Sequence, residues 1–483
     1  MASETPALQP IRPSRRLRLL GDDQLAGLRA ASLEILDEVG FHCPSEVALG
    51  IFTDHGARID REARVVRLPP DLVLEAMSRA PRFYTMGARS AAHDIVLDGT
   101  AMYVATDGCG VATIDAVSRE RRTSTERDVA DMARVADHLS SVGFYWPIVS
   151  AQDHPATAPL HELRASFAST VKHVQSETVM GEPTARYAIE MARVIADDEA
   201  TLRTRPPLSL LVCAIAPLAQ DRDGLESALA FAAAGLPVGF MSMATAGSTA
   251  PASIGGTIAL GDAEIIAALT LIQLAYPGAP VFHSLMPGVM HPRSGAYLAT
   301  TWEGEAAYAA GVEVAHHWGV PTLAGVFGTD AQVPGWEAAA AAPVALTLCA
   351  LLGAETGSGM GLLDGCTVLY PEQLLLDTDI YHRVRVNLAG LDTSREALAV
   401  DVIRSVGPRG HFLAERHTSE GLRRLALSDL TEQLDAGGAY RDPLEVARER
   451  VRWILDNHHP EPLDDARDAE LNRILQAAEG ELA

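Results

Sequence analysis

Three acidic residues stand where carboxylates could act on a small ligand. Asp330 follows the apolar run VPTLAGVF, Asp107 follows the run AMYVAT, and Glu264 lies in LGDAEIIAALTLIQL, where we expect it to begin a long helix. Each has a structural alternative, because a carboxylate at a helix start stabilises the helix and an Asp in a turn bonds its own backbone. If they face a cavity, the same three groups would neutralise a bound cation.

Aromatic and small polar residues occur at similar places in the sequence. Ring faces combined with negative charge are the groups that hold a small cation. Each ring taken alone also fits a place in the core. The candidate ligand contacts are the rings of Tyr103, Trp146, Phe327 and Trp336, with His283, Gly328 and Thr329 beside them.

The sequence contains no recognisable motif for binding a metal or a nucleotide or for a hydrolase nucleophile. His316 and His317 are adjacent, as are His458 and His459, so neither pair has the spacing of metal ligands on a helix. The segments GCGVAT and GSGMGL lack the last glycine of a dinucleotide loop, and neither a P-loop nor a G-x-S-x-G elbow occurs. The five cysteines are scattered without a C-x-x-C. We therefore expect no metal, nucleotide or disulfide framework.

Composition limits the partners. The chain has 483 residues, is 48% hydrophobic and carries a formal charge of −24. That charge repels phosphate, so nucleic acid and anionic membranes are excluded as partners. We find no run of about 18 apolar residues and no leader-like segment. The sequence predicts a cytoplasmic protein.

The elements that must position these residues follow a repeating order. Short apolar runs alternate with Ala-rich stretches of helical spacing, which is typical of βα units on a parallel sheet. Eight strands close a TIM (β/α)8 barrel, and a doubly wound open sheet is the alternative. The strands are expected at 101–106, 143–150, 171–176, 208–214, 236–243, 280–285, 321–327 and 353–360, and the helices at 127–139, 183–198, 225–234, 261–276, 302–319 and 336–353.

We divide the chain into three parts. Residues 1–98 form an N-terminal segment of helix and extended pieces packed on the barrel, residues 99–371 form the barrel, and residues 372–483 form a helical extension. The loops at the carboxyl ends of barrel strands carry the active site in this fold. The candidate residues therefore belong at one mouth.

Several long segments resemble one family. AGVFGTDAQVPGWEAA, LLGAETGSGMGLLDGCTVLYPEQLLLDTDI and VGPRGHFLAERHT follow one another in the order found in the trimethylamine methyltransferase family. The chain is most similar to its non-pyrrolysine branch, which includes glycine betaine:corrinoid methyltransferase. The resemblance implies a TIM barrel that moves a methyl group from an amine to the cobalt of a separate corrinoid protein, with no cofactor bound by the barrel itself.

The resemblance also implies roles for residues. Glu264 and Asp330 match acidic positions of the family, Asp107 lies in a loop with a related motif, and Gly328 stands where the trimethylamine enzymes carry pyrrolysine. Ser169 and Ser358 stand where the betaine-type enzymes have Asn and His, and both positions are expected to contact the betaine carboxylate. The substrate implied is a methylated, quaternary, betaine-like amine, and the two serines weaken the case for glycine betaine itself.

Two other functions stay open on the sequence alone. The chain could be a non-catalytic protein that binds a quaternary ammonium ligand, or a barrel enzyme of another chemistry that needs no corrinoid. If the chain is the methyltransferase that the resemblance implies, its expected partners are a small methylated amine and a corrinoid protein. An acidic, partly apolar barrel with a long helical tail is also expected to form a homo-oligomer.

Overall fold

A parallel barrel of eight strands forms the centre of the protein. The computed structural model describes residues 3–108, 110–115, 118–301 and 303–482. The strands lie in the order β14-β12-β11-β10-β9-β6-β18-β17. A parallel bridge between His283 and Thr322 joins β14 to the start of β17, so the sheet closes and the open-sheet alternative is wrong. The strands are β6 (Tyr103–Thr106), β9 (Val142–Tyr145), β10 (His173–Ser176), β11 (Leu208–Cys213), β12 (Val238–Ser242), β14 (Val281–Leu285), β17 (Leu323–Gly325) and β18 (Thr356–Met360).

All eight predicted strands are confirmed. Most of them were recognisable because a barrel strand is covered on both faces, so its sequence is largely apolar, as LSLLVC of β11 is. Alternate residues fill the interior, where Phe282 takes the room that Gly239 leaves: a Cβ on Gly239 would lie 2.0 Å from that ring. The glycine-rich run at 353–360 is a strand for a similar reason, because its Gly359 lies against the backbone of Phe327.

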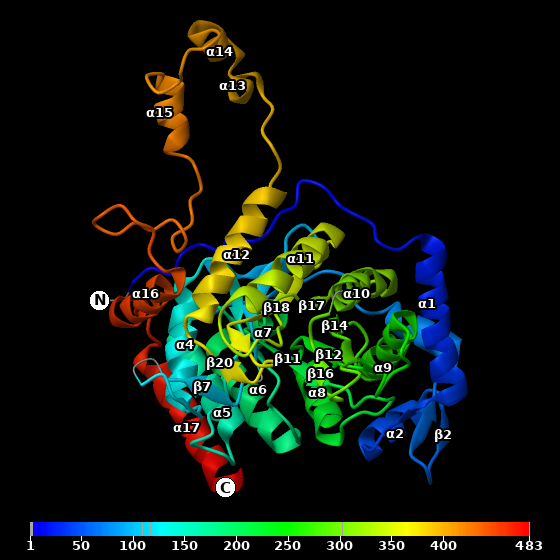
Figure 1. Ribbon diagram of the computed structural model, residues 1–483. Coiled ribbons are helices and arrows are strands. Elements are labelled where there is room, and N and C mark those ends of the chain that lie inside the picture. The colour runs from blue at the N-terminus through cyan, green and yellow to red at the C-terminus, as the bar shows by residue number, and fades with distance from the viewer. Residues whose placement is uncertain (1–2, 109, 116–117, 302, 483) are drawn as a thin grey trace.

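Eight helices surround the barrel (Figure 1). The six predicted helices are confirmed, whereas α5 was missed because its buried face includes His161, Glu162 and Ser166, which hide the helical pattern. The predicted boundary at 371 falls just before α12, which follows β18 in the place of the eighth barrel helix. The helices are α4 (Glu126–His138), α5 (Ala158–Ser169), α6 (Glu182–Ala196), α8 (Arg222–Ala234), α9 (Ile254–Ala275), α10 (Gly304–Trp318), α11 (Trp336–Leu352) and α12 (Gln373–Leu388).

Helix α9 begins seven residues earlier than predicted. It starts at Ile254, so Glu264 lies in its middle and the prediction that this residue begins the helix is wrong. Gly261 looked like a helix boundary, but its Cβ would meet Leu285 at 2.6 Å, so the glycine lets the helix pack closely on β14. By length and composition α9 could cross a membrane, yet most of it is buried inside the fold.

The N-terminal segment covers one side and one end of the barrel. Helices α1 (Asp22–Glu34) and α3 (Pro70–Met77) pack on α9, and α2 (Glu46–Asp54) packs on α8 and α9. The hairpin of β4 (Tyr84–Met86) and β5 (Ile95–Leu97) packs its apolar residues against the barrel interior. It closes the amino-terminal end of the barrel, so access is left to the opposite mouth. A further small sheet has the order β1-β3-β2, with β1 (Phe41–His42), β2 (Arg58–Asp60) and β3 (Val65–Arg67).

Two small sheets built from βα loops flank the mouth. The loops after β6 and β18 form a sheet in the order β19-β20-β7-β8, and the loops after β12 and β14 form one in the order β13-β15-β16. Their bounds are β7 (Ala112–Ile114), β8 (Arg121–Thr123), β13 (Thr245–Ala246), β15 (Gly288–Met290), β16 (Tyr297–Leu298), β19 (Leu362–Leu363) and β20 (Val368–Leu369).

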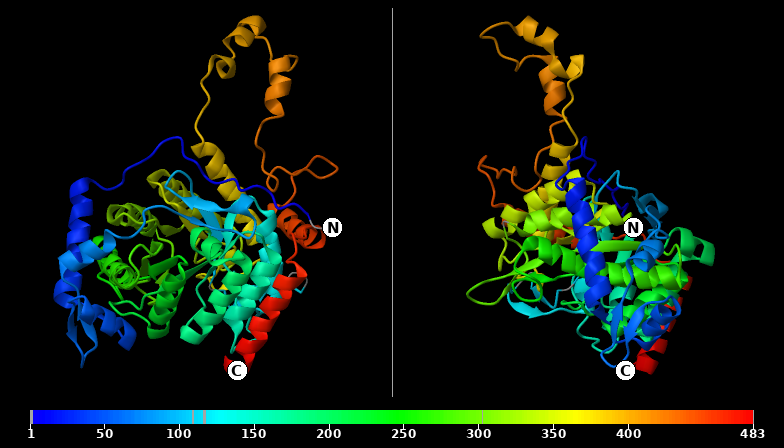
Figure 2. Two further views of the ribbon diagram at one scale, coloured as in Figure 1. Left: turned by 180° about the vertical axis from the view of Figure 1, so that it is seen from behind. Right: turned by 90° about the vertical axis from the view of Figure 1, so that its right-hand side faces the viewer.

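The C-terminal region returns to the barrel after a long excursion. Helices α16 (Pro443–Asn457) and α17 (Asp465–Leu482) pack along α4, α5 and α6, whereas residues 389–425, between α12 and α16, project away from the body (Figures 1 and 2).

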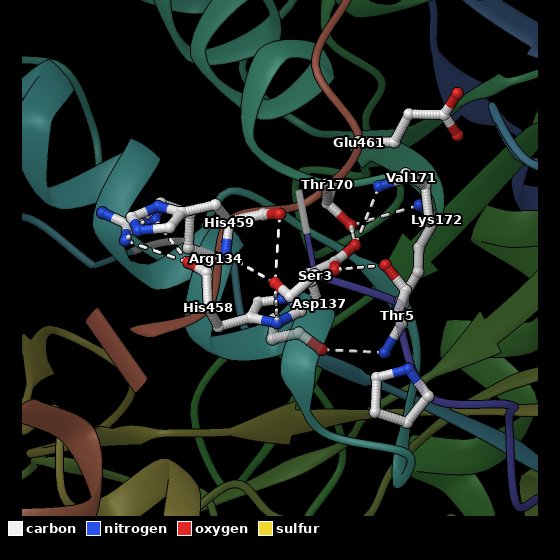
Figure 3. Close-up of polar contacts among 12 residues, drawn as sticks. Ser3, Thr5, Arg134, Asp137, Thr170, Val171, Lys172, His458, His459 and Glu461 are labelled. Carbon is white, nitrogen blue, oxygen red and sulfur yellow. Dashed lines mark hydrogen bonds and ion pairs between the residues drawn. The ribbon is translucent and has the colours of Figure 1, made fainter. Parts of the chain in front are cut away.

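A buried ionic cluster joins the N-terminal segment and the connection between α16 and α17 to the closed end of the barrel (Figure 3). The carboxylate of Asp137 accepts hydrogen bonds from Thr5 Oγ1 (2.6 Å), Thr170 Oγ1 (2.8 Å) and His458 Nε2 (2.7 Å). Lys172, the only lysine in the sequence, donates from Nζ to the carbonyls of Ala136, Leu139 and Val142 at 2.7–2.8 Å. All three donors of the ammonium group are thereby satisfied.

We expect Lys172 to resist amine-reactive reagents in the native protein. Burial lowers the pKa of Lys172 to about 7, so at pH 8 the amine would react readily if a reagent reached it, and only burial protects it. Peptide mapping by mass spectrometry should find Lys172 unmodified after labelling at pH 8, and fully modified when the label is added in guanidinium chloride. Equal labelling in both conditions would contradict the buried cluster.

Candidate active site

The carboxylate of Glu177 lies at the centre of the mouth. Glu177 directly follows β10, and its Oε1 accepts from the Sγ of Cys213, at the end of β11, at 3.3 Å. Its Oε2 is buried and has no hydrogen-bond partner among the described residues. Burial raises the pKa of Glu177 to about 7, with smaller contributions from the charges of Asp107 and Glu162, although the hydrogen bond from Cys213 lowers it. Both Glu177 and Cys213 keep part of their surface exposed, so solvent reaches the pair.

Asp107 and Trp146 lie on neighbouring strand ends. Asp107 follows β6, is 6% exposed, and accepts from the backbone N–H of Gly108 at 2.9 Å. The indole of Trp146, after β9, lies directly on Gly108, where a Cβ would come within 1.7 Å of Nε1. That Nε1 is buried without a partner among the described residues. A glycine at position 108 is therefore required for the ring to cover this side of the site.

Two further carboxylates complete the acidic group. Asp377, on α12, accepts from Gly361 N and Gln373 Nε2, both at 2.8 Å. Burial raises the pKa of Asp377 to about 7, with a contribution from the charge of Asp107. Glu162, on α5, accepts from Ser150, Ala151 and Thr178 and braces the loops after β9 and β10. The charges of these acids act on one another, so a ligand that brings positive charge would stabilise them.

The turn after β17 contains four of the predicted residues in different surroundings. Thr329 is buried, and its carbonyl accepts from Gly365 N, whereas Gly328 faces open space with only Cys366 Sγ within 4 Å of a Cβ. Asp330 accepts from the N–H groups of Ala299 and Thr300 at 3.0 Å, so it fastens the loop after β16. Phe327, whose ring was predicted to contact the ligand, is 2% exposed and packs in a core cluster.

Ser358 and Tyr103 lie on strands of the barrel wall. Ser358, in β18, is buried beside Gly325 of β17, and its carbonyl accepts from Val326 N and Phe327 N. Tyr103 belongs to the interior apolar cluster at the start of β6, so it lies in the closed half of the barrel.

Three predicted residues lie away from the mouth's interior. His283 points to the helix layer, where Nε2 pairs with Asp262 Oδ1 at 2.9 Å. Glu264 accepts from Leu218 N (2.7 Å) and Ser242 Oγ (2.6 Å), so it fixes the loop after β11 from outside the barrel wall. Ser169 ends α5, which places it at the closed end of the barrel, and the expectation that it contacts substrate with Ser358 does not fit this position.

Trp336 is the most exposed of the predicted aromatic residues. It begins α11, is 86% exposed, and therefore lies on the rim of the mouth instead of within it. Five other large apolar side chains are exposed on the loops of this face, after β6, β10, β11, β12 and β17. They are Val111, Met180, Ile215, Met243 and Val333.

The sequence analysis missed Glu177, Cys213 and Asp377 as members of the site. Glu177 gave a usable signal, because it is the residue that follows a predicted strand at the correct end. Asp377 gave none, because it lies on a helix after the predicted barrel boundary. Cys213 looked like core because its strand is apolar throughout.

One group of described side chains could hold a metal ion. The ligand atoms of Glu126, His154 and His161 lie within 4.8 Å of one another, outside the barrel wall. Hydrogen bonds already account for this arrangement: His161 pairs with Glu126 through Nδ1 and with Glu479 of α17 through Nε2, both at 3.0 Å. The cluster ties the last helix to α5. The expectation that the chain has no metal site stays a prediction.

Comparisons with known proteins agree with this architecture. The sequence matches the family model for trimethylamine methyltransferase over residues 2–482. The trimethylamine methyltransferase MttB of Desulfitobacterium hafniense (strain DSM 10664 / DCB-2) is 32% identical over 467 residues, which cover 95% of this chain and 94% of that protein. A glycine betaine methyltransferase of Desulfitobacterium hafniense (strain Y51) is 28% identical over 474 residues, which cover 95% of this chain and 97% of that protein.

The barrel also has a solved counterpart. The monomethylamine methyltransferase MtmB of Methanosarcina barkeri superposes with a TM-score of 0.50 at 14% sequence identity, covering 98% of this chain and 89% of that structure. This similarity supports the fold alone. Because the family match extends over nearly every residue, the chain belongs to the trimethylamine methyltransferase family and is a methyltransferase.

Proposed function

We propose that this protein transfers a methyl group from a quaternary methylated amine to the Co(I) of a corrinoid protein. The observation that carries the proposal is the buried acidic group at the mouth. Asp107, Glu162 and Glu177 act on one another there, and one oxygen of Glu177 has no partner among the described residues. A quaternary ammonium ion supplies charge without an N–H donor and fits against the indole of Trp146.

The chemistry of such a substrate suits a site without a nucleophile of its own. The methyl carbon passes to cobalt as the C–N bond breaks, and the bonding electron pair stays on nitrogen. A neutral tertiary amine leaves without needing a proton, and cobalt goes from Co(I) to methyl-Co(III). The barrel's own task is to hold the cation in line and keep water away, which is catalysis by positioning and electrostatics.

Gly328 supports a quaternary substrate over trimethylamine. The position that carries pyrrolysine in the trimethylamine branch has no side chain here, and a Cβ would have only Cys366 Sγ within 4 Å. No group at this position can form an adduct with a neutral amine. Ser358, inside the barrel, is the remaining candidate for contact with a carboxylate or hydroxyl carried by the substrate.

The apolar rim fits the docking of a corrinoid protein. Exposed apolar side chains on the βα loops, with Trp336 the most exposed, surround the opening through which cobalt must approach. Aromatic residues are the commonest centres of binding energy at such interfaces. This surface also lies on the face that the acidic group opens to.

We expect Trp336→Glu to weaken docking without affecting the chemistry. The KM for the corrinoid protein should rise roughly tenfold or more, since a buried aromatic anchor contributes about 2 kcal/mol. The rate with free cob(I)alamin should stay unchanged because Trp336 lies on the rim. Phe83→Glu, an exposed aromatic outside the mouth, is the matched control and should leave both constants unchanged. An equal loss with free cob(I)alamin would contradict a docking role.

The function itself is tested by following methyl-Co(III) spectroscopically. Co(I) corrinoid, free or protein-bound, is mixed with the enzyme and a panel of trimethylamine, glycine betaine, proline betaine and carnitine. The proposal expects turnover with at least one quaternary amine and none with trimethylamine. Saturable ligand binding without methyl transfer to any acceptor would instead identify a binding protein.

A further inference from the structure

Residues 389–425, which we call the arm, leave the body of the protein entirely. The arm starts after α12 and contains α13 (Arg395–Leu398), α14 (Val400–Val406) and α15 (Arg416–Leu422). Within the described residues of these three helices, none is buried. The views in Figures 1 and 2 agree that the arm projects as a loop of helices well beyond the barrel.

The arm carries apolar side chains that nothing in its own chain covers. Leu391 is 89% exposed and Leu413 is 83% exposed. A segment without buried residues gains no hydrophobic stabilisation to offset the entropy lost on ordering its backbone. Helices of this composition are therefore expected to be stable only against another surface. The other exposed apolar residues of the arm are Leu398, Val400, Ile403, Phe412, Leu422 and Leu425.

The charge of the arm differs from that of the remaining chain. Residues 389–425 contain six arginines and five acidic residues, whereas the whole protein has a formal charge of −24. The arm is thus slightly positive, whereas the rest of the chain is strongly negative, so a second copy presents the arm mainly with surface of opposite sign. This complementarity favours another copy of the same chain as the partner.

The arm lies at the end of the barrel opposite the mouth. Helix α12 begins beside the mouth, where Asp377 bonds Gly361 N, and runs back to Leu388, whose carbonyl accepts from Ser14 N. The neighbouring α11 ends at the same level, where the carbonyl of Leu351 accepts from Leu17 N. A corrinoid protein that brings cobalt to the mouth would therefore not cover the arm.

A groove at the base of the arm offers a receiving surface. It has a cavity volume of about 860 Å³ and lies between α12, α16 and the chain that returns from the arm. Its lining includes the apolar Leu375, Val386, Leu427 and Trp453, the acidic Asp379, Asp429, Glu432 and Glu449, and the basic Arg383, Arg385 and Arg450. The arm brings apolar residues and arginines to such a surface.

We propose that the arm docks onto a second copy of this chain and places its apolar side chains in the groove at the base of that copy's arm. Each chain carries both the arm and the groove, so a twofold axis allows the exchange in both directions at once. A stable interface of standard size buries on the order of 1,500 Å² in total, and an exchange of two arms contributes two contact surfaces toward that area. This inference does not depend on the substrate or on the corrinoid.

The test measures molar mass in solution by light scattering on a sizing column, with the full chain alone at micromolar concentration. The wild-type protein is expected at twice the chain mass of 51.3 kDa or a higher even multiple. The double variant Leu391→Asp/Leu413→Asp on the arm, and Trp453→Glu in the groove, should each shift the mass to that of a single chain. Val47→Asp, at an exposed apolar residue of α2, is the matched control and should leave the mass unchanged.

Circular dichroism and methyl transfer to free cob(I)alamin should stay unchanged in the arm variant, because the arm lies away from the mouth. A wild-type protein that is a single chain at all concentrations would overturn the proposal, as would an assembly that the arm variant leaves intact. An assembly that depends on the arm but survives Trp453→Glu would show that the groove is not the receiving surface. A single chain that assembles only with a corrinoid protein through the arm would assign the arm to that partner.

Discussion

Replacing Glu177 with glutamine is expected to lower kcat/KM for a quaternary methylamine about 100-fold, which corresponds to about 2.7 kcal/mol of transition-state stabilisation. The substitution keeps the hydrogen-bonding shape of the side chain but removes the charge that faces the ammonium nitrogen. Truncating one partner of a buried charge pair commonly costs about 2–5 kcal/mol. Steady-state formation of methyl-Co(III) measures the change.

The pH dependence of the same step separates a functional Glu177 from a structural one. A quaternary ammonium ion does not titrate, so the profile reports the enzyme. Because the pKa of Glu177 is raised to about 7, the carboxylate becomes charged only as pH rises through that value. Wild-type kcat/KM should therefore rise about tenfold per unit below pH 7 and level off above it. Glu177→Gln should show a flat profile.

The stability of the protein changes with pH in the opposite direction to its activity. The folded protein holds the proton of Glu177 more tightly than the unfolded chain, whose glutamate has an ordinary pKa near 4.5. The free energy of unfolding therefore loses a contribution as pH rises from 4.5 to about 7. Glutamine removes this penalty, so at pH 8 the variant should melt at the same or a higher temperature while its activity is lost.

Glu264→Gln is the matched comparison, because Glu264 is the buried glutamate that the sequence favoured. Its carboxylate fixes Leu218 N and Ser242 Oγ outside the barrel wall, so the variant should lose stability and keep the shape of the pH profile. If Glu264→Gln flattened the profile and Glu177→Gln did not, the roles assigned to the two residues would be reversed.

Lys172→Met is expected to lower the free energy of unfolding by about 3–5 kcal/mol, since removing one partner of a buried ionic cluster leaves the others uncompensated. The carbonyls of Ala136, Leu139 and Val142 would lose their donor, and Asp137 would lose a neighbouring positive charge. Urea titration followed by circular dichroism measures the change.

Thr5→Val is the control for this cluster. It removes a single hydrogen bond to Asp137 and should cost only about 1 kcal/mol. Methyl transfer at low temperature should be normal in both variants, because the cluster lies at the closed end of the barrel. A Lys172→Met protein as stable as wild type would show that the buried ammonium group contributes nothing net.

The local sequence was sufficient to predict the barrel and the eight strands that close it. Apolar residues dominate strands such as β11 (LSLLVC) because both faces of the strand are covered, and a single sequence displays such a run. Helix α5 was missed because three of its buried residues, His161, Glu162 and Ser166, are polar. The start of α9 was misplaced because Gly261 serves close packing and not a turn. A glycine in a sequence does not show whether it serves a turn of the chain or the close packing of two elements.

The acidic chemistry of the site was readable from the sequence, but its members were decided by the tertiary structure. Asp107 was found because it follows a strand at the mouth. Whether a carboxylate after a strand points into the barrel, as Glu177 does, or fastens a neighbouring loop, as Asp330 does, depends on side-chain direction and on partners far away in the chain. Asp377 enters from a helix that follows the last strand. Sequence determined that this protein is a barrel with an acidic mouth, and only the folded structure decided which carboxylates are buried together, because desolvation and mutual repulsion exist only once distant residues share one cavity.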